Sequence, residues 1–446
     1  MSSNSSKIQP RIIIHGGAGN ISRANLTPAA HAAYRKSLLA VISSASSLLG
    51  KPHATALDVA THAVSLLEDD PLFNAGKGAV FTRAGTNELE SSIMVSNGPH
   101  KRGVGCMLLT HVKNPIKLAR EMLLRGELGD GGGAQGHCQL SGEYMESLAK
   151  EWGLEMVEQT YFFTQRRWDE HQRGLKVGSE PLSSIAQFHD PFSARPNNSS
   201  VTKPVYRGSE KDPSWDGKEY LPQGTVGAVV LDNFGTVCVA TSTGGLTNKL
   251  PGRIGDTPTL GAGFWAEEWF EEISSPQMLY QPIIIQPPYP SPIDKLSRGN
   301  LLGFVADCFP SVSIASSSSH PQASAKPYSE QSASTRRHAV AMSGTGNGDS
   351  FLRVSAVRTT AAISRFSTPN LPLAVAVSRV AGSGGELQKS AGERWGNTGE
   401  GEGGIVGIEL IDSESTIVAD FNCGGMFRAW VDDTGKQRCM VFKDEY

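Results

Sequence analysis

The sequence is poor in cysteine: six cysteines are scattered through 446 residues, and no two are spaced as Cys-x-x-Cys. This pattern is typical of reduced thiols in a reducing compartment rather than of a disulfide framework. Long apolar runs are also missing, since no window approaches the ~18 apolar residues of a membrane span. The opening residues, 1–10, lack the apolar core of a signal peptide. We therefore expect a cytoplasmic protein that does not cross a membrane.

The sequence also lacks an excess of charge of one sign. Lys and Arg number 41 against 44 Asp and Glu, and the basic clusters, such as Arg166-Arg167 and Arg336-Arg337, are short. Nucleic-acid binders usually carry a basic field over a whole face, so we expect no nucleic-acid partner. The 11 histidines include no His-Glu-x-x-His or similar spacing, which gives metal catalysis no support.

Strand and helix patterns are present in both halves of the chain, and the 39% hydrophobic content is enough for a sizeable core. A loop over 68–82 has a strand behind it. Further strands are predicted at 11–19, 88–95, 103–109, 225–231, 235–242, 404–411 and 415–421, and helices at 28–49, 55–68, 114–125, 141–152, 350–364 and 371–381. The pattern predicts a mixed α/β fold, with one core shared by both halves of a single domain over 1–446.

Two tracts show no sustained periodicity. Residues 165–222 are polar and rich in Pro, Ser, Asp and Arg, and we interpret them as a polar linker. Residues 270–340 are rich in Ser, Pro and Gln, and we interpret them as a surface insertion. A cut in the chain is least disruptive in the linker.

Thr225 is the most informative residue. It follows Gly224 at the start of an apolar strand, directly after the polar linker. If the chain were cut between these two residues, Thr225 would own both a hydroxyl nucleophile and a free amine to activate it. An α-amine titrates near pH ~8, so much of it is unprotonated at neutral pH. A threonine that opens a strand is nevertheless usually just a residue with good β propensity, so the prediction depends on other motifs.

Those motifs are present in order along both halves. They are His15-Gly-Gly-Ala-Gly19, Phe73-Asn-Ala-Gly-Lys-Gly-Ala-Val-Phe-Thr82, Gly224-Thr-Val-Gly-Ala-Val-Val-Leu-Asp232, Thr241-Ser-Thr-Gly-Gly-Leu-Thr-Asn-Lys-Leu-Pro-Gly-Arg-Ile-Gly-Asp256 and Ser343-Gly-Thr-Gly-Asn-Gly-Asp349. Together they closely resemble the plant-type L-asparaginase and isoaspartyl-peptidase family of N-terminal-nucleophile hydrolases.

The resemblance implies a four-layer αββα sandwich made as a precursor that cleaves itself before Thr225. The products would be an α chain of 1–224 and a β chain of 225–446. Thr225 would then attack the side-chain amide of L-asparagine or a β-aspartyl peptide, and water would hydrolyse the β-aspartyl ester. No cofactor takes part in this chemistry, and relatives usually pair two αβ heterodimers.

Roles at the reacting centre are carried over by motif. Thr243 would hydrogen-bond near the new amine, and Asn74 would orient the nucleophile. The hydroxyl of Thr345 and the backbone at Gly346 would form the oxyanion hole, which stabilises charge that appears only in the transition state.

The resemblance also implies a grip on the substrate's amino-acid head. Arg253 would bind the α-carboxylate, for which a guanidinium is the natural bidentate partner. Asp256 and the Gly348 carbonyl would accept the α-ammonium. Family members also hold a sodium ion with backbone carbonyls, which suit hard cations. The matching residues here are Leu67, Glu68, Asp70, Phe73, Ala75 and Lys77.

Several positions depart from the family pattern. Asn347 and Asp349 stand where His and Glu are more usual, and Glu90-Ser-Ser92 replaces an acidic-alanine pair. The separation between Asp256 and Thr345 is also much longer than typical. The extra tract would form a lid over the pocket or a flap that admits longer substrates, which leaves the substrate open.

Three functions therefore remain. The favoured one is an asparaginase with β-aspartyl dipeptidase activity, because Arg253 and Asp256 together recognise both charges of a free asparagine head. The second is a relative with larger substrates, either a glycosylasparaginase or a threonine endopeptidase resembling taspase. The third is a binding or scaffold protein that never cleaves itself.

Overall fold

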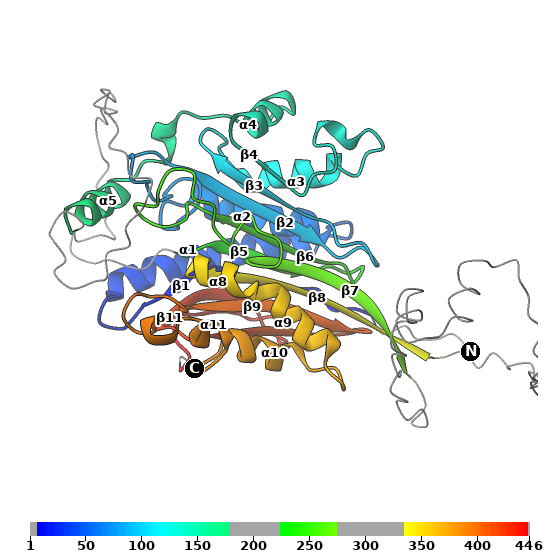
Figure 1. Ribbon diagram of the computed structural model, residues 1–446. Coiled ribbons are helices and arrows are strands. Elements are labelled where there is room, and N and C mark those ends of the chain that lie inside the picture. Colours follow the sequence, from blue (N-terminus) through cyan, green and yellow to red (C-terminus); the bar gives the residue numbers. More distant parts are fainter. Residues whose placement is uncertain (1–6, 178–223, 274–333, 445–446) are drawn as a thin grey trace, which may run out of the picture. The chain divides into compact units, whose positions relative to one another are not determined.

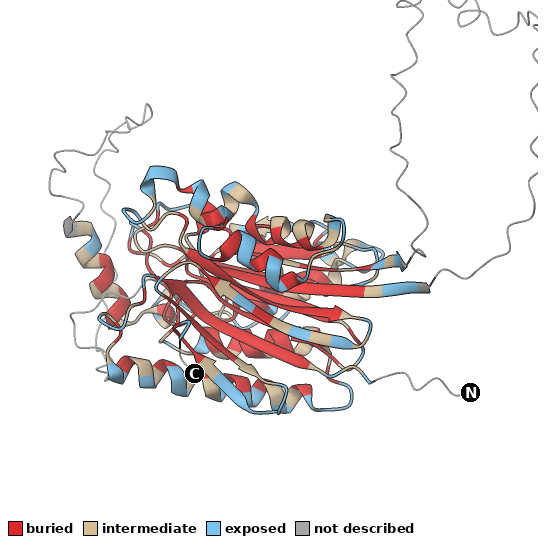
Figure 2. Ribbon diagram, turned by 90° about the horizontal axis from the view of Figure 1, so that it is seen from below, coloured by how far each residue is buried: buried red, intermediate tan, exposed pale blue. Residues whose placement is uncertain are grey.

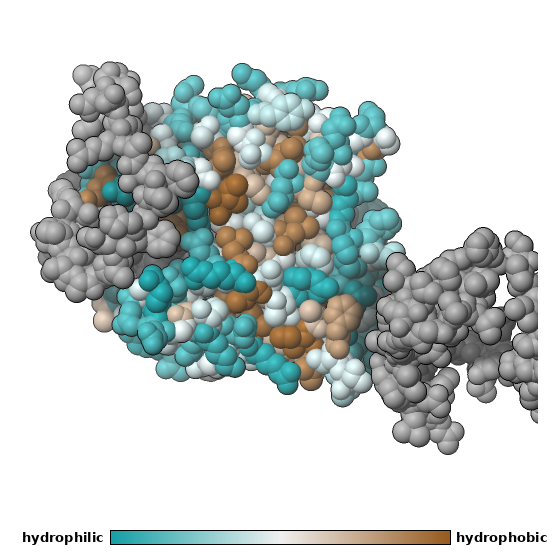
Figure 3. Space-filling model, in the orientation of Figure 1, coloured by the Kyte–Doolittle hydropathy of each residue, from teal (hydrophilic) through white to brown (hydrophobic). Residues whose placement is uncertain are grey.

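The computed structural model describes residues 7–177, 224–273 and 334–444, which form two β-sheets and the helices that cover them (Figure 1). The described residues outside 271–336 belong to one compact unit. On the face drawn in Figure 3, hydrophobic residues lie along the middle with hydrophilic residues around them.

The larger sheet has the strand order β12-β11-β1-β5-β6-β2-β3-β4. Its pairs are antiparallel except β3 with β4. Its strands are β1 (Arg11–Gly19), β2 (Leu89–Val95), β3 (Gly103–Leu109), β4 (Gln139–Ser141), β5 (Val226–Leu231), β6 (Val237–Thr243), β11 (Gly425–Val431) and β12 (Gln437–Met440). The strand that follows Thr225 thus lies in the middle of this sheet.

The smaller sheet has the order β10-β9-β8-β7. Its strands are β7 (Phe264–Ile273), β8 (Ser334–Gly346), β9 (Gly403–Ile411) and β10 (Glu414–Phe421). The described helices are α1 (Pro28–Leu49), α2 (Ala56–Asp69), α3 (Pro115–Arg125), α4 (Gly142–Glu151), α5 (Gln165–Val177), α8 (Gly348–Val354), α9 (Ala356–Phe366), α10 (Leu373–Ala381) and α11 (Glu386–Ser390).

Side-chain alternation along the strands builds the layers. Ile12 and Ile14 pack in the core beneath α1 and α2, whereas Ile13 packs between the two sheets. In β8, Ala341 faces the layer between the sheets, and Met342 packs in the core beneath α9 and α10. Because successive strand residues point to opposite faces, two apolar faces per sheet produce three cores and four layers. Buried residues run along the strands accordingly (Figure 2). The predicted αββα sandwich is confirmed.

Parts of both irregular tracts prove to be regular structure. Residues 165–177 of the predicted linker form α5, while 178–222 lie outside the described residues. The predicted insertion is bounded by β7 up to Ile273 and by β8 from Ser334, and 274–333 lie outside the described residues. The edges of both tracts are therefore regular secondary structure, and the interpretation of the remaining residues as linker and insertion stays a prediction.

Smaller differences have local causes. The helix predicted at 350–364 is two helices, because Ser355 takes a left-handed conformation with φ of 46° and ends α8. The strand predicted behind the 68–82 loop is a series of turns followed by one isolated bridge at Thr82. In the described part of the chain, no helix combines the length and apolar character needed to cross a membrane.

Candidate active site

The layer between the sheets is apolar in its middle and turns polar at one end. In β6, the face that carries Val239 continues through Thr241 to Thr243, and in β8 the face that carries Ala341 continues through Ser343 to Thr345. All four hydroxyl residues are buried. Two-residue periodicity alone therefore brings hydroxyls from both sheets together.

Thr225 lies at this polar end, directly before β5. Its Oγ1 is 2.7 Å from Oγ1 of Thr257, and both side chains are buried. The Thr257 carbonyl accepts hydrogen bonds from Ser92 Oγ at 2.7 Å and from Thr241 Oγ1 at 3.3 Å. Two strands thus fix Thr257 as a neighbour of the nucleophile. The motifs missed this residue, although its position directly after Asp256 is the signal that could have found it.

The peptide bond before Thr225 is enclosed by backbone and by Thr345. A Cβ on Gly224 would lie 2.5 Å from Thr345 Oγ1 and 2.6 Å from the Ala18 nitrogen, so only glycine fits. Gly17, which lies against Gly224, has φ of 117°, which also favours glycine. Thr345 Oγ1 donates to the Thr225 carbonyl at 3.1 Å. In the uncleaved chain its hydroxyl is therefore beside the predicted cleavage point, but bonded to the carbonyl that follows it.

His15 lies behind this centre. Its Nε2 is 2.6 Å from Ser343 Oγ, and the two atoms fill the space where a Cβ of Gly227 would stand. Burial lowers the pKa of His15 to about 3, while the Thr225 backbone acts in the opposite direction. The imidazole is therefore neutral at physiological pH.

Thr243 is placed next to Thr225 by sheet register, because β5 and β6 pair Val226 with Ser242. Its Oγ1 accepts a hydrogen bond from the Gly245 nitrogen at 3.0 Å. Asn74 Nδ2 donates to the Gly245 carbonyl at 2.8 Å. Asn74 thus holds the loop after β6 rather than the Thr225 hydroxyl, and any effect on the nucleophile passes through this loop.

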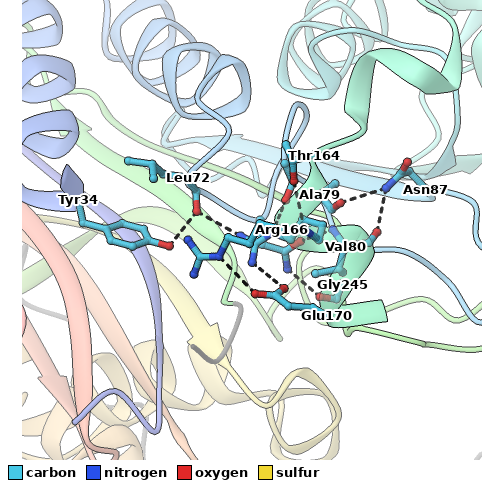
Figure 4. Close-up of polar contacts among 12 residues, drawn as sticks. Tyr34, Leu72, Ala79, Val80, Asn87, Thr164, Arg166, Glu170 and Gly245 are labelled. Atoms are coloured by element: carbon cyan, nitrogen blue, oxygen red, sulfur yellow. Dashed lines mark hydrogen bonds and ion pairs between the residues drawn. The ribbon is translucent and has the colours of Figure 1, made fainter. Parts of the chain in front are cut away.

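Arg167, at the start of α5, is fully buried. Its Nε donates to the Gly78 carbonyl at 2.7 Å and its Nη2 to the Leu72 carbonyl at 3.1 Å, and its Nη1 pairs with Glu170 at 3.0 Å. Figure 4 draws polar contacts in this region, with Leu72, Glu170 and Gly245 labelled. Asn74 lies between the two carbonyls in the chain, so α5 fixes the loop that carries it. No pattern in the sequence indicated this role, because Arg167 lies in the tract predicted as a linker.

The predicted substrate grip is brought together. A Cβ on Gly348 would contact Asp256 Oδ1 and would lie 3.0 Å from Arg253 Nη2. Arg253 Nη2 also donates to Asp349 Oδ1 at 3.1 Å. Burial raises the pKa of Asp256 from 3.8 to about 7, and Arg253 opposes that shift. Asp256 Oδ2 and Arg253 Nε are buried without a hydrogen-bond partner among the described residues. These two buried charged groups therefore keep polar atoms that no group of the described chain satisfies.

Glu90 is a further buried carboxylate behind this grip. Register places it beside Thr243, and its Oε1 accepts from the Gly255 nitrogen at 2.9 Å. Burial raises the pKa of Glu90, whereas Lys249 and Arg253 lower it. The departure at 90–92 thus keeps an acidic group next to the arginine, and it also supplies Ser92 to hold Thr257.

The loop between α2 and β2 turns carbonyls inward. Gly76, with φ of 46°, lies against the Glu68 carbonyl, which accepts from the Lys77 nitrogen at 2.7 Å. A Cβ on Gly78 would lie 2.7 Å from the Phe73 carbonyl. Carbonyl oxygens are ligands that hard cations prefer. The donor chemistry of this loop therefore fits a sodium ion.

Comparison with known proteins agrees with this geometry. Residues 8–275 match the protein family described as "Asparaginase". The "Isoaspartyl peptidase" of Escherichia coli is 37% identical over 255 residues, which cover 57% of this chain and 67% of that protein. The "Isoaspartyl peptidase" of Salmonella typhimurium is 36% identical over 255 residues, covering 57% and 69%. The "Isoaspartyl peptidase/L-asparaginase" of Bos taurus is 31% identical over 269 residues, covering 60% and 71%. The family match includes Thr225, Arg253 and Asp256 and ends before Thr345.

Proposed function

This chain belongs to the asparaginase family, and from that premise we propose that it hydrolyses the side-chain amide of L-asparagine and the β-aspartyl bond of isoaspartyl peptides. The nucleophile is Thr225, freed by cleavage after Gly224. One observation carries the proposal: the buried Thr225 hydroxyl, the Thr345 hydroxyl and the Arg253–Asp256–Gly348 grip meet at one end of the layer between the sheets.

Maturation uses the hydroxyl before the amine exists. Thr225 Oγ1 loses its proton as it attacks the Gly224 carbonyl carbon, and the Thr225 nitrogen gains that proton as the C–N bond breaks. The acyl group thus moves from nitrogen to oxygen. Water then hydrolyses this ester and leaves the Gly224 carboxylate and the free Thr225 amine. Thr257 accepts or donates a hydrogen bond at the attacking oxygen, so it orients the hydroxyl during this step.

In the mature enzyme the Thr225 amine removes the proton from Oγ1, which attacks the substrate's side-chain carbonyl carbon. Thr345 Oγ1 and the Gly346 nitrogen stabilise the oxyanion. For this role the Thr345 hydroxyl turns from the Thr225 carbonyl toward the substrate. The amine returns the proton to the leaving nitrogen as the C–N bond breaks, and it then takes a proton from the water that hydrolyses the β-aspartyl ester.

The grip selects the amino-acid head. The Arg253 guanidinium binds the α-carboxylate. To do so it must give up its hydrogen bond to Asp349. Asp256 accepts the α-ammonium with the Gly348 carbonyl. A cation close to Asp256 lowers the pKa of its carboxyl again and keeps it ionised, so the substrate completes the charge balance of the site.

A sodium ion held by carbonyls of the 67–77 loop, and a dimer of αβ heterodimers, are further parts of this proposal. Leu67, Glu68, Asp70, Phe73, Ala75 and Lys77 would supply the carbonyls. Bound there, the ion would stiffen the loop that carries Asn74. The inward carbonyls at Glu68 and Phe73 support it.

The decisive experiment follows purified protein on a denaturing gel during incubation, with N-terminal sequencing of the products. Two bands, one of which begins at Thr225, are expected. The matured material is then assayed with L-asparagine, a β-aspartyl dipeptide and a glycosylated asparagine, with turnover expected for the first two. A single full-length band after prolonged incubation favours an uncleaved scaffold. Turnover of the glycosylated substrate alone favours a glycosylasparaginase.

A further inference from the structure

A pocket of about 350 Å³ lies next to the reacting centre and is not used by the grip. We name it the Glu402 pocket. Its described lining includes Ala18, Thr247, Gly346, Asn347 and Glu402. Its size falls within the roughly 300–1,000 Å³ of small-molecule sites. The pocket is therefore large enough to bind part of a substrate.

The first constraint is the position of the Thr225 amine. Cleavage liberates this amine where Gly224 is bonded, and Gly224 lies against Gly17 and the Ala18 nitrogen. The amine must reach the leaving nitrogen to return its proton, so the two nitrogens lie within hydrogen-bond distance. Ala18 also lines the pocket. The leaving nitrogen is therefore released next to the Glu402 pocket.

The second constraint comes from the residues that follow β8. Gly346 and Asn347 line the pocket, whereas Gly348 contacts Asp256 in the grip. The pocket and the grip are thus adjacent, because Asn347 of the lining and Gly348 of the grip follow the oxyanion residues Thr345 and Gly346 directly. A substrate whose head occupies the grip and whose carbonyl lies at Thr345 projects its leaving group toward the pocket.

The third observation concerns charge. Among the described lining residues, Glu402 is the only one with an ionisable side chain. It is half-buried, and its carboxylate has no hydrogen-bond or ion-pair partner among the described residues. Burial accordingly raises the pKa of Glu402. Thr247 Oγ1 is also buried without a partner in the described chain. An unpaired half-buried carboxylate is stabilised by a cation.

From these three observations we infer that the Glu402 pocket binds the leaving group of β-aspartyl peptides and favours a leaving residue with a cationic side chain. The inference rests on the proposed function and adds a substrate class to it. The ammonia released from asparagine leaves the pocket empty, whereas the amino acid released from a β-aspartyl dipeptide occupies it. Glu402 then pairs with a lysine or arginine side chain and repels an acidic one.

The test compares kcat/KM of matured protein for β-aspartyl-lysine, β-aspartyl-leucine and β-aspartyl-glutamate. We expect lysine to exceed glutamate about 10-fold or more, with leucine between them. In Glu402→Gln, an isosteric change, the lysine-to-glutamate ratio should fall to within about 2-fold. In Glu402→Lys the preference should reverse.

Glu400→Gln is the matched control, because Glu400 is two residues away and pairs with Arg353 and Arg394 instead of lining the pocket. It should keep the parent ratio. A parent ratio near one, or a Glu402→Gln protein that keeps the parent ratio, overturns the inference while the proposed function stands. Failure of the proposed function is distinct: the parent protein then hydrolyses neither asparagine nor any of the three peptides, and the inference falls with it.

Discussion

The nucleophile centre and the substrate grip are neighbours in the chain, since Thr257 directly follows Asp256 and Gly348 lies three residues after Thr345. The two are nevertheless built from opposite kinds of side chain. The centre consists of neutral hydroxyls, with Thr225 bonded to Thr257 and Thr345 bonded to the Thr225 carbonyl. The grip consists of buried charges, in which atoms of Arg253 and Asp256 lack partners among the described residues. The hydroxyl centre is complete within the protein except for the amine that cleavage creates. In the proposed function, the ligand completes the grip.

The largest effect is expected from removing the nucleophile. Thr225→Ala should abolish both chain cleavage and amide hydrolysis, because one hydroxyl serves in both. Gel analysis and an ammonia-release assay with asparagine measure the two steps. Thr225→Ser is the control, since it keeps a hydroxyl and should retain both activities at a lower rate. Asparagine turnover by Thr225→Ala protein would reject the assignment.

Substitutions in the substrate grip should weaken substrate binding but should not prevent chain cleavage at Thr225. Arg253→Ala should lower kcat/KM for asparagine about 100-fold, mainly through KM, because two charge-assisted hydrogen bonds to the α-carboxylate are lost. Maturation should proceed largely as in the parent. Arg253→Lys should recover only part of the loss, since an ammonium lacks the bidentate fork. An unchanged KM for Arg253→Ala would mean that the carboxylate binds elsewhere.

The grip should also respond to pH through Asp256. Its pKa is raised from 3.8 to about 7 by burial, and the substrate ammonium requires the ionised form. As pH falls below about 7, KM should therefore rise toward 10-fold per pH unit. In Asp256→Asn, KM should be high and should lose this dependence. Titration of the Thr225 amine affects kcat instead, so a parent KM that stays flat between pH 8 and 6 would contradict this role.

The same carboxyl predicts a stability effect of defined sign. The folded protein holds this proton more tightly than the unfolded chain, so Asp256 makes the free energy of unfolding decrease as pH rises from about 4 to about 7. Without ligand, Asp256→Asn should remove that contribution. Chemical denaturation of parent and variant at several pH values measures it, and a parallel pH dependence of both proteins would argue against a raised pKa.

The smallest effect should come from the neighbour of the nucleophile. Thr257→Val keeps the shape of the side chain but removes one hydrogen bond to Thr225, worth about 1 kcal/mol, so kcat should fall about 5- to 10-fold. Thr257→Ser should be close to the parent. If valine is as active as threonine at this position, the hydroxyl of Thr257 does not orient the nucleophile.

Much of the architecture was accessible from local patterns. Strands such as β5 and β6 are continuous apolar runs joined at Gly235, whose φ of 81° suits a tight turn. Helices α1 and α2 carry apolar residues at helical spacing behind capping threonines, Thr27 and Thr55. In these elements the burial that stabilises the fold is visible in the period of the sequence itself.

Helix α5 had no such signal. Its sequence is strongly polar, and it is held by the buried Arg167 with its carbonyl partners and by the contact of Trp168 with Phe81. The sequence also did not predict the end of β7 or the start of β8, because both lie in a tract rich in Ser and Pro that lacks periodicity. Hydrogen bonds to distant backbone leave no period in a sequence, so they could not be predicted from it.

The sequence by itself determined the apolar strands, the long helices and the order of motifs that pointed to Thr225, Arg253 and Asp256. Only the tertiary structure decided that Thr257 forms a hydrogen bond with Thr225, that Asp349 accepts a hydrogen bond from Arg253, and that the unpaired Glu402 lines a pocket. Each of these depends on chain segments far apart in sequence that meet at the end of one buried layer. The distances between such segments, and the loss of water that shifts the pKa of their side chains, are set only by packing.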